Sequence, residues 1–477
     1  MPNLNKLTYY QNYSEIEKDF YAPVSLLPNG KPIQTMYCFL GRVTPWDNLL
    51  QPSSPEDSDL LPDVPLQTQR YLKSTYKDIF VMKKITTNDI SPVIQRNDWI
   101  SGFIYDAYAD DADMFALDEN GYLLYTFYVK NRYDQVFKCL WNANSAESVD
   151  EPFFQPGSYQ TNNIFYGDDG YKWKYIYTID IGRKNKFMDI LWMPVPVTSN
   201  TPNPILSAAG TGSIDVINVI DGGDNYDTQN SIISIVITGD GTGANAAAVI
   251  DSNTQSLTYK QITGISVTNP GTNYTYATAT VVVANTSLIT ATQGSGAILT
   301  APVSPLGGHG FNPVTELGCS RIMITAEFNG TESGYIPTDI KYRQVGLIAS
   351  PSARSTYPAL ANGAIYKAYT EVFVSAGFGL FNSSETVYQG TLTNQTYSGT
   401  VLSFDEAANL VKLINTQGTP SLSAPLYGAS TGTVRTLLSN NSTDIIINSG
   451  YITYIENRES ITRSDDGTEQ FKFVLGY

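Results

Sequence analysis

Hydrophobic residues along the chain follow two different spacings, which predict different elements. Residues 66–80 (LQTQRYLKSTYKDIF) have helical spacing, and their apolar side chains would share one face: Leu72, Tyr76, Ile79 and Phe80. Other apolar stretches alternate or are rich in β-branched and aromatic residues, as strands are; they are residues 35–43, 115–129, 171–181, 321–328 and 339–348. The pattern predicts a mainly β fold with some α, an α+β class with a multi-domain, β-sandwich-like core and inserted all-β domains.

Turn residues predict two chain reversals. Asp118-Glu119-Asn120-Gly121 would close a hairpin within residues 115–129. Asp465-Asp466-Gly467 would reverse the chain between YITYIENR (451–458) and the final FKFVLGY, whose two-residue period puts these side chains on one face: Phe471, Phe473, Leu475 and Tyr477. We expect these last two runs to form a hairpin that completes a sheet begun far upstream.

Two segments differ in composition from the rest and predict inserted domains. Residues 205–300 have almost no Lys or Arg and contain a repeat, in which Asn225-Tyr226 and Asn273-Tyr274 lie 48 residues apart and a glycine cassette recurs at Gly210, Gly241 and Gly294. Such a repeat predicts two similar β units that bury a core between them. Residues 376–437, with short strands between Gly and Asn, predict a small SH3-like or OB-like barrel.

A chain of 477 residues is too long for one ordinary core. The two inserts would interrupt a core that consists of residues 1–204, 301–375 and 438–477. Because a repeat pair can bury its own core, we expect that removal of residues 205–300 leaves the rest of the chain folded.

The charge balance argues against a nucleic-acid surface. The chain has 29 Lys and Arg against 45 Asp and Glu, a net charge of −16, and no long basic run. No window has the apolar run of a signal peptide or a membrane span, which predicts a protein made and used in a cytosol-like compartment. Three widely spaced cysteines, Cys38, Cys139 and Cys319, form no disulfide framework and are interpreted as small buried hydrophobes.

Candidate catalytic and metal-binding groups are few. The single histidine, His309, lies in a GGHG loop and is interpreted as a loop or packing residue, which leaves a nucleophilic triad without a base. No paired-cysteine zinc spacing occurs, and the Asp110–Asp118 cluster lacks the ligand pattern of a calcium loop. Acidic groups for sugar hydrolysis would be Asp168-Asp169, Asp465-Asp466 or Asp98 beside Trp99. The prediction is no enzyme, no catalytic residues, no cofactor and no metal.

Five short motifs occur in a fixed order along the chain. They are Gly41–Trp46 (GRVTPW), Arg96–Trp99 (RNDW), Tyr171–Tyr175 (YKWKY), Tyr342–Ile348 (YRQVGLI) and Tyr454–Arg458 (YIENR). Together they resemble the baseplate wedge subunit of T-even-like contractile-tailed bacteriophages, the gene product eight family. The resemblance covers about half of the chain, from Tyr37 to Pro196, Cys319 to Ser350 and Ser449 to Tyr477, and leaves out both inserts.

The resemblance implies a structural role in a virion. It implies a wedge component that bridges neighbouring baseplate subunits, as a homodimer within each wedge, assembled in the host cytoplasm and located in the tail baseplate, with no nucleic acid and no membrane insertion. Low charge and many Tyr and Asn residues also suit a subunit that buries large interfaces. The motif residues interpreted as structural or interface positions are Arg42, Trp46, Arg96, Trp99, Trp173, Arg343, Glu456 and Arg458.

Two other functions fit a Tyr-rich, β-rich chain. A carbohydrate-binding tail adhesin would bind glycans in isolation. A glycoside hydrolase would need a carboxylate pair that faces a cleft. Glycan binding or turnover by the purified protein distinguishes both from a wedge subunit.

Overall fold

The computed structural model describes residues 35–46, 62, 64–66, 68–119, 121–155, 163–197, 211–229, 231–285, 293–357 and 359–476. Three residues named above, Asn120, Gly210 and Tyr477, lie outside these ranges. The fold is mainly β, with 47% strand and 7% helix, several sheets and a six-stranded barrel, which confirms the predicted β-rich α+β, multi-domain class. The chain divides into two compact units: unit 1 contains residues 1–90 and 324–473, and unit 2 contains residues 91–323 and 474–477.

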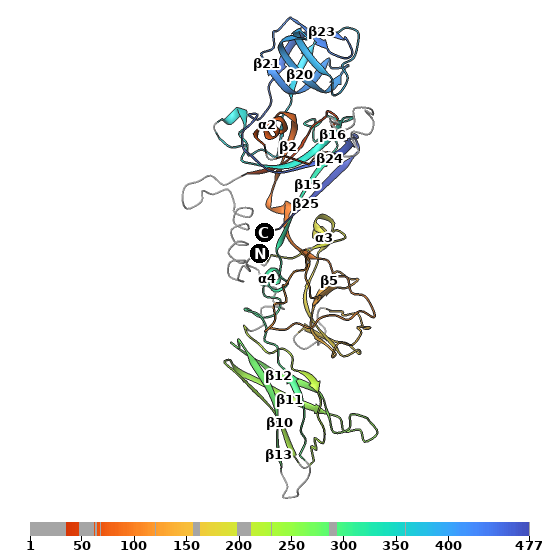
Figure 1. Cartoon of the computed structure of the whole chain (residues 1–477), viewed down its shortest axis with the longest axis vertical. Coiled ribbons are helices and arrows are strands. Elements are labelled where there is room, and N and C mark those ends of the chain that lie inside the picture. Colours follow the sequence, from red (N-terminus) through yellow and green to blue (C-terminus); the bar gives the residue numbers. More distant parts are fainter. Residues whose placement is uncertain are drawn as a thin grey trace. The chain divides into compact units, whose positions relative to one another are not determined.

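Unit 1 is built on a five-stranded antiparallel sheet (Figure 1). Its order is β17 (Ile365–Lys367), β2 (Ile79–Ile85), β1 (Met36–Gly41), β16 (Lys341–Ala349) and β24 (Tyr451–Thr462). The apolar sequence of β1 explains its position, because a strand paired on both edges and covered on both faces needs hydrophobic residues throughout. Two 3₁₀ turns, Thr87–Asp89 and Arg354–Thr356, follow β2 and β16 along the chain.

A second, four-stranded sheet has the order β25 (Thr468–Gly476), β15 (Arg321–Asn329), β3 (Ile90–Gln95) and β8 (Trp192–Pro194). Aromatic side chains of β25 meet those of the five-stranded sheet in unit 1, and Phe328 of β15 packs beside them. Phe471 contacts Phe328 and Tyr342 edge-on, at centroid distances of 6.1 and 6.4 Å, and Phe473 contacts Tyr454 at 5.5 Å. These contacts form a sandwich-like core.

The predicted helix is present but shorter than its periodicity suggests. Helix α2 covers Gln69–Asp78, and the Thr68 side chain caps its N-terminus. The sequence pattern predicted that Ile79 and Phe80 continue the helical face. They begin β2 instead. The run IFVMKKI can pair with β1, and this tertiary pairing overrides the helical spacing at the boundary.

The predicted C-terminal hairpin is wrong, although its turn is present. The chain reverses at Asp465–Gly467, yet β24 pairs with β16 while β25 belongs to the four-stranded sheet. The two strands therefore complete different sheets, each begun far upstream. Phe471 and Phe473 are buried, as the two-residue period predicts.

Unit 2 contains a four-stranded sheet with the order β4 (Tyr128–Lys130), β5 (Gln135–Asn142), β7 (Tyr171–Thr178) and β6 (Ile164–Tyr166). Helix α3 (Ile181–Phe187) follows β7, and the one-turn helix α4 (Pro313–Glu316) precedes β15. The predicted 115–129 hairpin is reduced to a turn with one bridge, Leu117 to Leu123. Beyond it, the Thr126 carbonyl accepts from the Asp106 amide instead of a hairpin partner.

The first insert is a set of antiparallel ribbons. They are β9 (Asn218–Asp221) with β14 (Ile298–Thr300), β10 (Ser231–Gly239) with β13 (Ala277–Asn285), and β11 (Thr242–Ile250) with β12 (Ile262–Thr272). The repeat has a structural cause. Gly241 packs on the ring of Tyr274 and Gly294 on the ring of Tyr226. The glycine cassette of each sequence repeat therefore supports the tyrosine of the other repeat. A Cβ at either glycine would collide with the ring.

The second insert is a closed barrel of six strands in unit 1. They are β18 (Thr370–Val374), β19 (Thr386–Thr391), β20 (Asn394–Asp405), β21 (Leu410–Gly418), β22 (Pro425–Gly428) and β23 (Val434–Asn441). Its core consists mainly of Val and Leu from alternate positions of these strands. The barrel occupies the range in which the sequence predicts one, and extends a few residues beyond 376–437 at both ends.

Candidate functional site

Five of the eight predicted positions lie together in unit 1. The guanidinium of Arg42 stacks on the ring of Trp46 at 3.9 Å, and Arg42 donates to the carbonyl of Pro45 at 3.1 Å. The buried Trp46 indole donates to the carbonyl of Arg458 at 2.9 Å. The GRVTPW segment is thereby fixed to β24.

The other members of this group also make internal contacts. The buried guanidinium of Arg343 donates to the carbonyl of Val43 at 2.5 Å. Glu456 and Arg458, two residues apart on one face of β24, form an ion pair of 2.9 Å. The Arg458 guanidinium lies 5.4 Å from the ring of Phe471. These contacts make the group a structural element that connects the GRVTPW, YRQVGLI and YIENR motifs.

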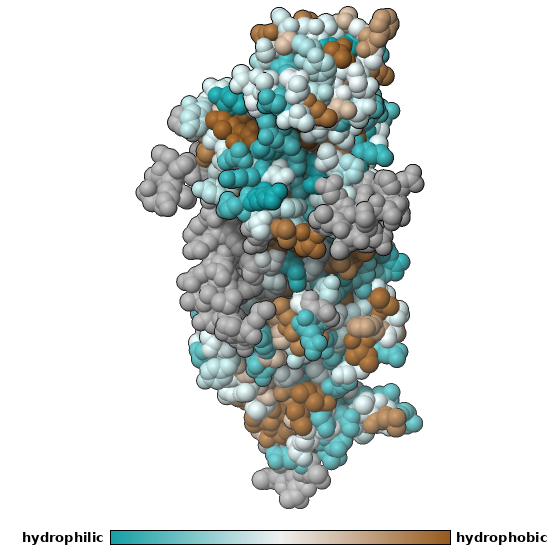
Figure 2. Space-filling view, turned by 45° about the horizontal axis from the view of Figure 1, so that its top comes forward, coloured by the Kyte–Doolittle hydropathy of each residue, from teal (hydrophilic) through white to brown (hydrophobic). Residues whose placement is uncertain are grey.

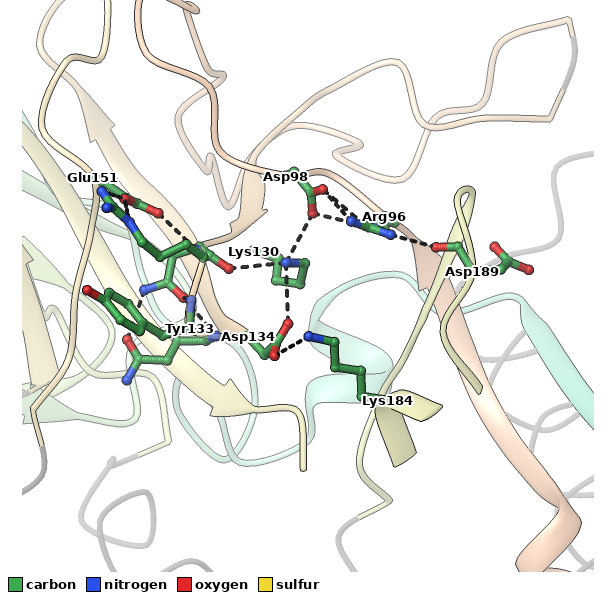
Figure 3. A network of polar contacts seen from close by, with 11 residues as sticks. Arg96, Asp98, Lys130, Tyr133, Asp134, Glu151, Lys184 and Asp189 are labelled. Carbon is green, nitrogen blue, oxygen red and sulfur yellow. Dashed lines mark hydrogen bonds and ion pairs between the residues drawn. The ribbon is translucent and has the colours of Figure 1, made fainter. Parts of the chain in front are cut away.

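A second group, around Arg96, lies in unit 2 (Figure 3). Arg96 binds the Asp98 carboxylate through Nε and Nη2, at 3.0 and 2.6 Å. Lys130 lies 3.3 Å from Asp98 and 3.4 Å from Asp134, which also binds Lys184 at 2.8 Å. Burial raises the pKa of Asp98, but the Arg96 hydrogen bond and the Lys130 charge outweigh it and lower that pKa overall.

The network holds the base of a loop formed by residues 99–105. The Trp99 amide donates to the Lys130 carbonyl at 2.9 Å, and the Trp99 indole donates to the hydroxyl of Ser148 at 3.1 Å. Ser148 also pairs with the loop backbone: its carbonyl accepts from Gly102 at 2.7 Å and its amide donates to Phe103 at 3.0 Å.

The far end of the loop is fixed by one tyrosine. The Tyr105 hydroxyl accepts from the Ile100 amide at 2.6 Å and lies 3.2 Å from the Ile100 carbonyl. The Tyr105 ring rests on Trp173, edge-on at 5.3 Å, and Trp173 stacks on Tyr171 at 5.5 Å. Trp173, another predicted position, is fully buried and forms the floor below the loop.

Asp169 fixes the neighbouring segment. Its carboxylate accepts from the Ser148 hydroxyl and from the amides of Val149, Asp150 and Tyr171, at 2.8 to 3.2 Å. With four donors, this carboxylate is a structural hydrogen-bond acceptor.

This fixed loop presents apolar side chains to solvent. Ile100, Phe103, Ile104 and Val149 are 45 to 61% exposed, and we call them the apolar loop patch. The backbone of Ile100, Phe103 and Val149 is held by the bonds to Tyr105, Ser148 and Asp169 described above. A preformed apolar surface is what a protein-binding site needs, since little conformational entropy is lost when it binds.

Three acidic residues, Asp98, Glu147 and Asp150, lie directly before or beside the patch residues in the chain. Asp98 is paired with Arg96 and Lys130, and Asp150 accepts from the Asp168 amide.

The sequence did not reveal a buried charge cluster on the other face of the same sheet. Lys138 of β5 binds Glu316 at 3.0 Å, and His309 Nδ1 lies 2.6 Å from the same carboxylate. Burial raises the pKa of Glu316, but the Lys138 charge and the contact with His309 outweigh it and bring it to about 2. Burial and Lys138 lower the pKa of His309. His309 is thus a buried packing residue, consistent with the sequence interpretation.

The alternating sequence YKWKY of β7 could have revealed that this face of the sheet carries lysine side chains. Tyr171, Trp173 and Tyr175 point to the aromatic core, so Lys172 and Lys174 point the other way. Lys174 binds Asp215 at 2.7 Å, and Lys172 donates to Ile217 and Asn218 at 3.1 and 2.9 Å, all at the root of the first insert. Burial lowers the pKa of Lys172 to about 8.

Within the part of the chain that the structure describes, no group of three or more His, Cys, Asp or Glu residues is placed to hold a metal ion. Cys38, Cys139 and Cys319 are buried free thiols. Among the described residues, no helix has the length and hydrophobicity needed to span a bilayer.

Comparison with known proteins adds no relative. No protein-family model matches the chain, and no curated protein matches it.

Proposed function

We propose that this chain is a structural subunit of a contractile phage tail baseplate wedge, where it bridges neighbouring baseplate proteins during assembly and host attachment. It acts without catalysis, cofactor, nucleic acid or membrane insertion, and it resides in the virion after assembly in the host cytoplasm.

The observation that carries the proposal is the apolar loop patch. Three of its four residues, Ile100, Phe103 and Ile104, directly follow the RNDW motif, and that motif supplies Arg96, Asp98 and Trp99, which hold the loop. Motif residues that rigidify an exposed apolar loop suit a subunit whose task is to bind other proteins. The visible surface carries several separate hydrophobic groups among hydrophilic residues, which suits a protein with more than one neighbour (Figure 2).

Labelling of whole particles tests the proposal. An antibody raised against the purified chain is applied to phage particles produced with the gene that encodes it, and the particles are imaged by negative stain. We expect label at the baseplate end of contractile tails. Particles whose tails carry no label, although the chain is expressed, would overturn the proposal.

A complementation experiment assigns the binding surface. In particles made without the native chain, Phe103→Glu would put a charge in the centre of the patch and is expected to reduce incorporation into tails at least about tenfold. The matched control is Leu257→Glu, at a fully exposed apolar residue of the first insert. Equal incorporation of both variants would show that the patch is not the contact.

The adhesin alternative has one observation in its favour. Tyr388 and Tyr427, on neighbouring strands of the barrel, stack with centroids 5.5 Å apart, as in aromatic platforms for sugars. A glycan array with the purified chain tests it, and glycan binding lost in Tyr388→Ala would favour the adhesin over the wedge subunit.

A further inference from the structure

Unit 2 contains a pocket at one end of the four-stranded sheet. It is lined where β3 ends and where β8 and β15 begin, at Gln95, Trp192 and Arg321, and by residues of the 117–123 turn. The pocket holds about 290 Å³ of empty space, which includes the solvent at its mouth. This volume is at the lower limit for ligand pockets, so the pocket suits a group the size of one side chain.

Among the described residues that line this pocket, Arg321 alone is charged. Its guanidinium lies 4.6 Å from the centre of the Trp192 ring, and Nη2 donates to the Gly121 carbonyl at 2.8 Å. Within the described part of the chain, no carboxylate pairs with Arg321, and its Nε and Nη1 atoms have no acceptor. Solvent reaches both atoms. The stacked guanidinium is therefore held in place with donor nitrogens left over for a ligand.

The other polar side chains of the pocket add further donors. Gln95 Oε1 is buried and has no partner among the described residues, so the accessible end of this amide is the donor Nε2. The Ser320 hydroxyl is accessible and makes no hydrogen bond to a described residue. The Tyr128 hydroxyl is already engaged, because it donates to the Gln95 carbonyl at 3.0 Å.

Two acidic residues lie next to pocket residues in the chain, and both are engaged in their own turns. Asp118 accepts from the Tyr122 amide at 2.8 Å. Asp189 accepts from the amides of Leu191 and Trp192, both at 2.7 Å. Neither carboxylate lines the pocket. In a chain with a net charge of −16, the pocket thus combines a cation that has no acidic partner in the described residues with several donors.

We propose that this pocket binds a carboxylate on a short apolar stem, supplied by the C-terminus or an acidic side chain of another protein. Guanidinium N–H groups form charge-assisted hydrogen bonds with carboxylates, which are roughly twice as strong as neutral ones. The apolar lining suits the stem: Val93, Ile94, Leu117 and Leu123. A neutral group of the same shape would leave the Arg321 charge uncompensated.

This inference goes beyond the proposed function and does not rest on it, because the binding of a small carboxylate is a property of the purified full chain. Ligand-detected NMR titration measures it with two probes, butyrate and its neutral analogue butyramide. We expect butyrate to bind in the millimolar range, as suits so small a ligand, and butyramide to bind at least about tenfold more weakly.

Three variants assign the binding to this pocket. Arg321→Gln removes the charge and should weaken butyrate binding at least about tenfold. Leu117→Asp places an acid at a half-exposed lining position, where it should fold normally and weaken butyrate binding by repulsion. The matched control is Arg132→Gln, which removes the same charge from a side chain that is 68% exposed and outside the pocket, and should bind butyrate like the wild type. Circular dichroism checks that each variant is folded.

Short peptides distinguish the two sources of the carboxylate. A peptide with a free C-terminus and no acidic side chain represents a chain end, and an amidated peptide with one internal Glu represents a side chain. Binding of either one supports the proposal and names the source.

The proposal fails if butyrate does not bind, or if butyramide binds as tightly as butyrate. It fails equally if folded Arg321→Gln and Leu117→Asp bind butyrate like the wild type, or if Arg132→Gln weakens binding as much as Arg321→Gln, since a general charge effect would then explain the result.

Discussion

Lys174 and Asp215 form an ion pair with 2.7 Å between Nζ and Oδ2, and both side chains are buried. Lys174 belongs to β7 and Asp215 to the root of the first insert. Two residues earlier on the same face of β7, Lys172 binds Ile217 and Asn218. The insert is therefore held to the sheet by buried charged contacts and is not attached by a simple tether, which is consistent with its inclusion in unit 2.

Removal of one partner of this pair should be costly. Lys174→Met leaves Asp215 buried without its counter-charge, and we expect a loss of about 3 to 5 kcal/mol in the free energy of unfolding. Chemical denaturation of the full chain, followed through the unfolding of unit 2, measures this loss. The double variant Lys174→Met/Asp215→Leu should be more stable than either single variant, and a double variant as unstable as the sum of both would contradict the pairing argument.

The buried charge cluster of Lys138, His309 and Glu316 should make the stability of unit 2 sensitive to acid. The pKa of Glu316 is about 2 in the folded chain and near 4.5 when unfolded, so its contribution is complete above pH 4.5 and is lost as the pH falls toward 2. The lowered pKa of His309 acts in the same direction below pH 6.5, because the unfolded chain takes up that proton first.

Glu316→Gln tests this pH dependence. The variant should be less stable than the wild type at pH 7, and the difference in unfolding free energy should narrow between pH 4.5 and pH 3. His309→Gln serves as the control for the milder window below pH 6.5. A difference that stays constant from pH 7 to pH 3 would rule out the assigned titration of Glu316.

Trp46 tests the structural interpretation of the GRVTPW motif. Trp46→Ala removes a buried ring on which Arg42 stacks, together with the hydrogen bond to Arg458, and should cost about 3 to 5 kcal/mol and lower the melting temperature by several degrees. Thermal unfolding measures it, with Leu257→Ala as an exposed control. An unchanged melting temperature with lost partner binding would make Trp46 an interface residue.

The periodicity of the chain predicted its strands well where one face is buried. The alternation of β7 and the Phe471 and Phe473 positions of β25 are examples. Pairing was not predictable in the same way. YITYIENR and FKFVLGY flank a turn and look like a hairpin, but β24 and β25 have better partners far upstream, and no local pattern contains that information.

The candidate site was predicted only in part. The order of the motifs indicated Arg96 and Trp99. The structure adds that both residues hold the loop that exposes Phe103. The charge cluster was missed because Lys138, Asp215 and Glu316 are distant in sequence and each looks like a surface residue.

The C-terminal strand should be essential for unit 1. A chain that ends at Gly467 loses Phe471 and Phe473, whose rings contact Phe328, Tyr342 and Tyr454. Burial of each ring is worth roughly 1.5 to 3 kcal/mol, a large share of a typical net stability of about 5 to 15. We expect the truncated chain to be insoluble. If it stayed soluble and melted like the wild type, the strand would not be needed for the fold.

The boundaries of the first insert can now be placed more precisely than residues 205–300. That deletion would remove Asp215 and Asn218, the partners of Lys174 and Lys172, and should destabilise the rest of unit 2. In contrast, β9 and β14 pair antiparallel, with Asp221 opposite Ile298.

Excision of residues 222–297 therefore leaves two paired strand ends that an Asn-Gly turn can join, since such a turn suits a two-residue hairpin. We expect this shorter deletion to fold cooperatively but to melt below the full chain, because Ile214, Ile217, Ala301 and Val303 lose packing partners in the removed strands. The 205–300 deletion should melt lower still or aggregate. Differential scanning calorimetry of both proteins compares them directly. If the 205–300 deletion proved the more stable of the two, the buried lysine contacts would not be what holds the insert.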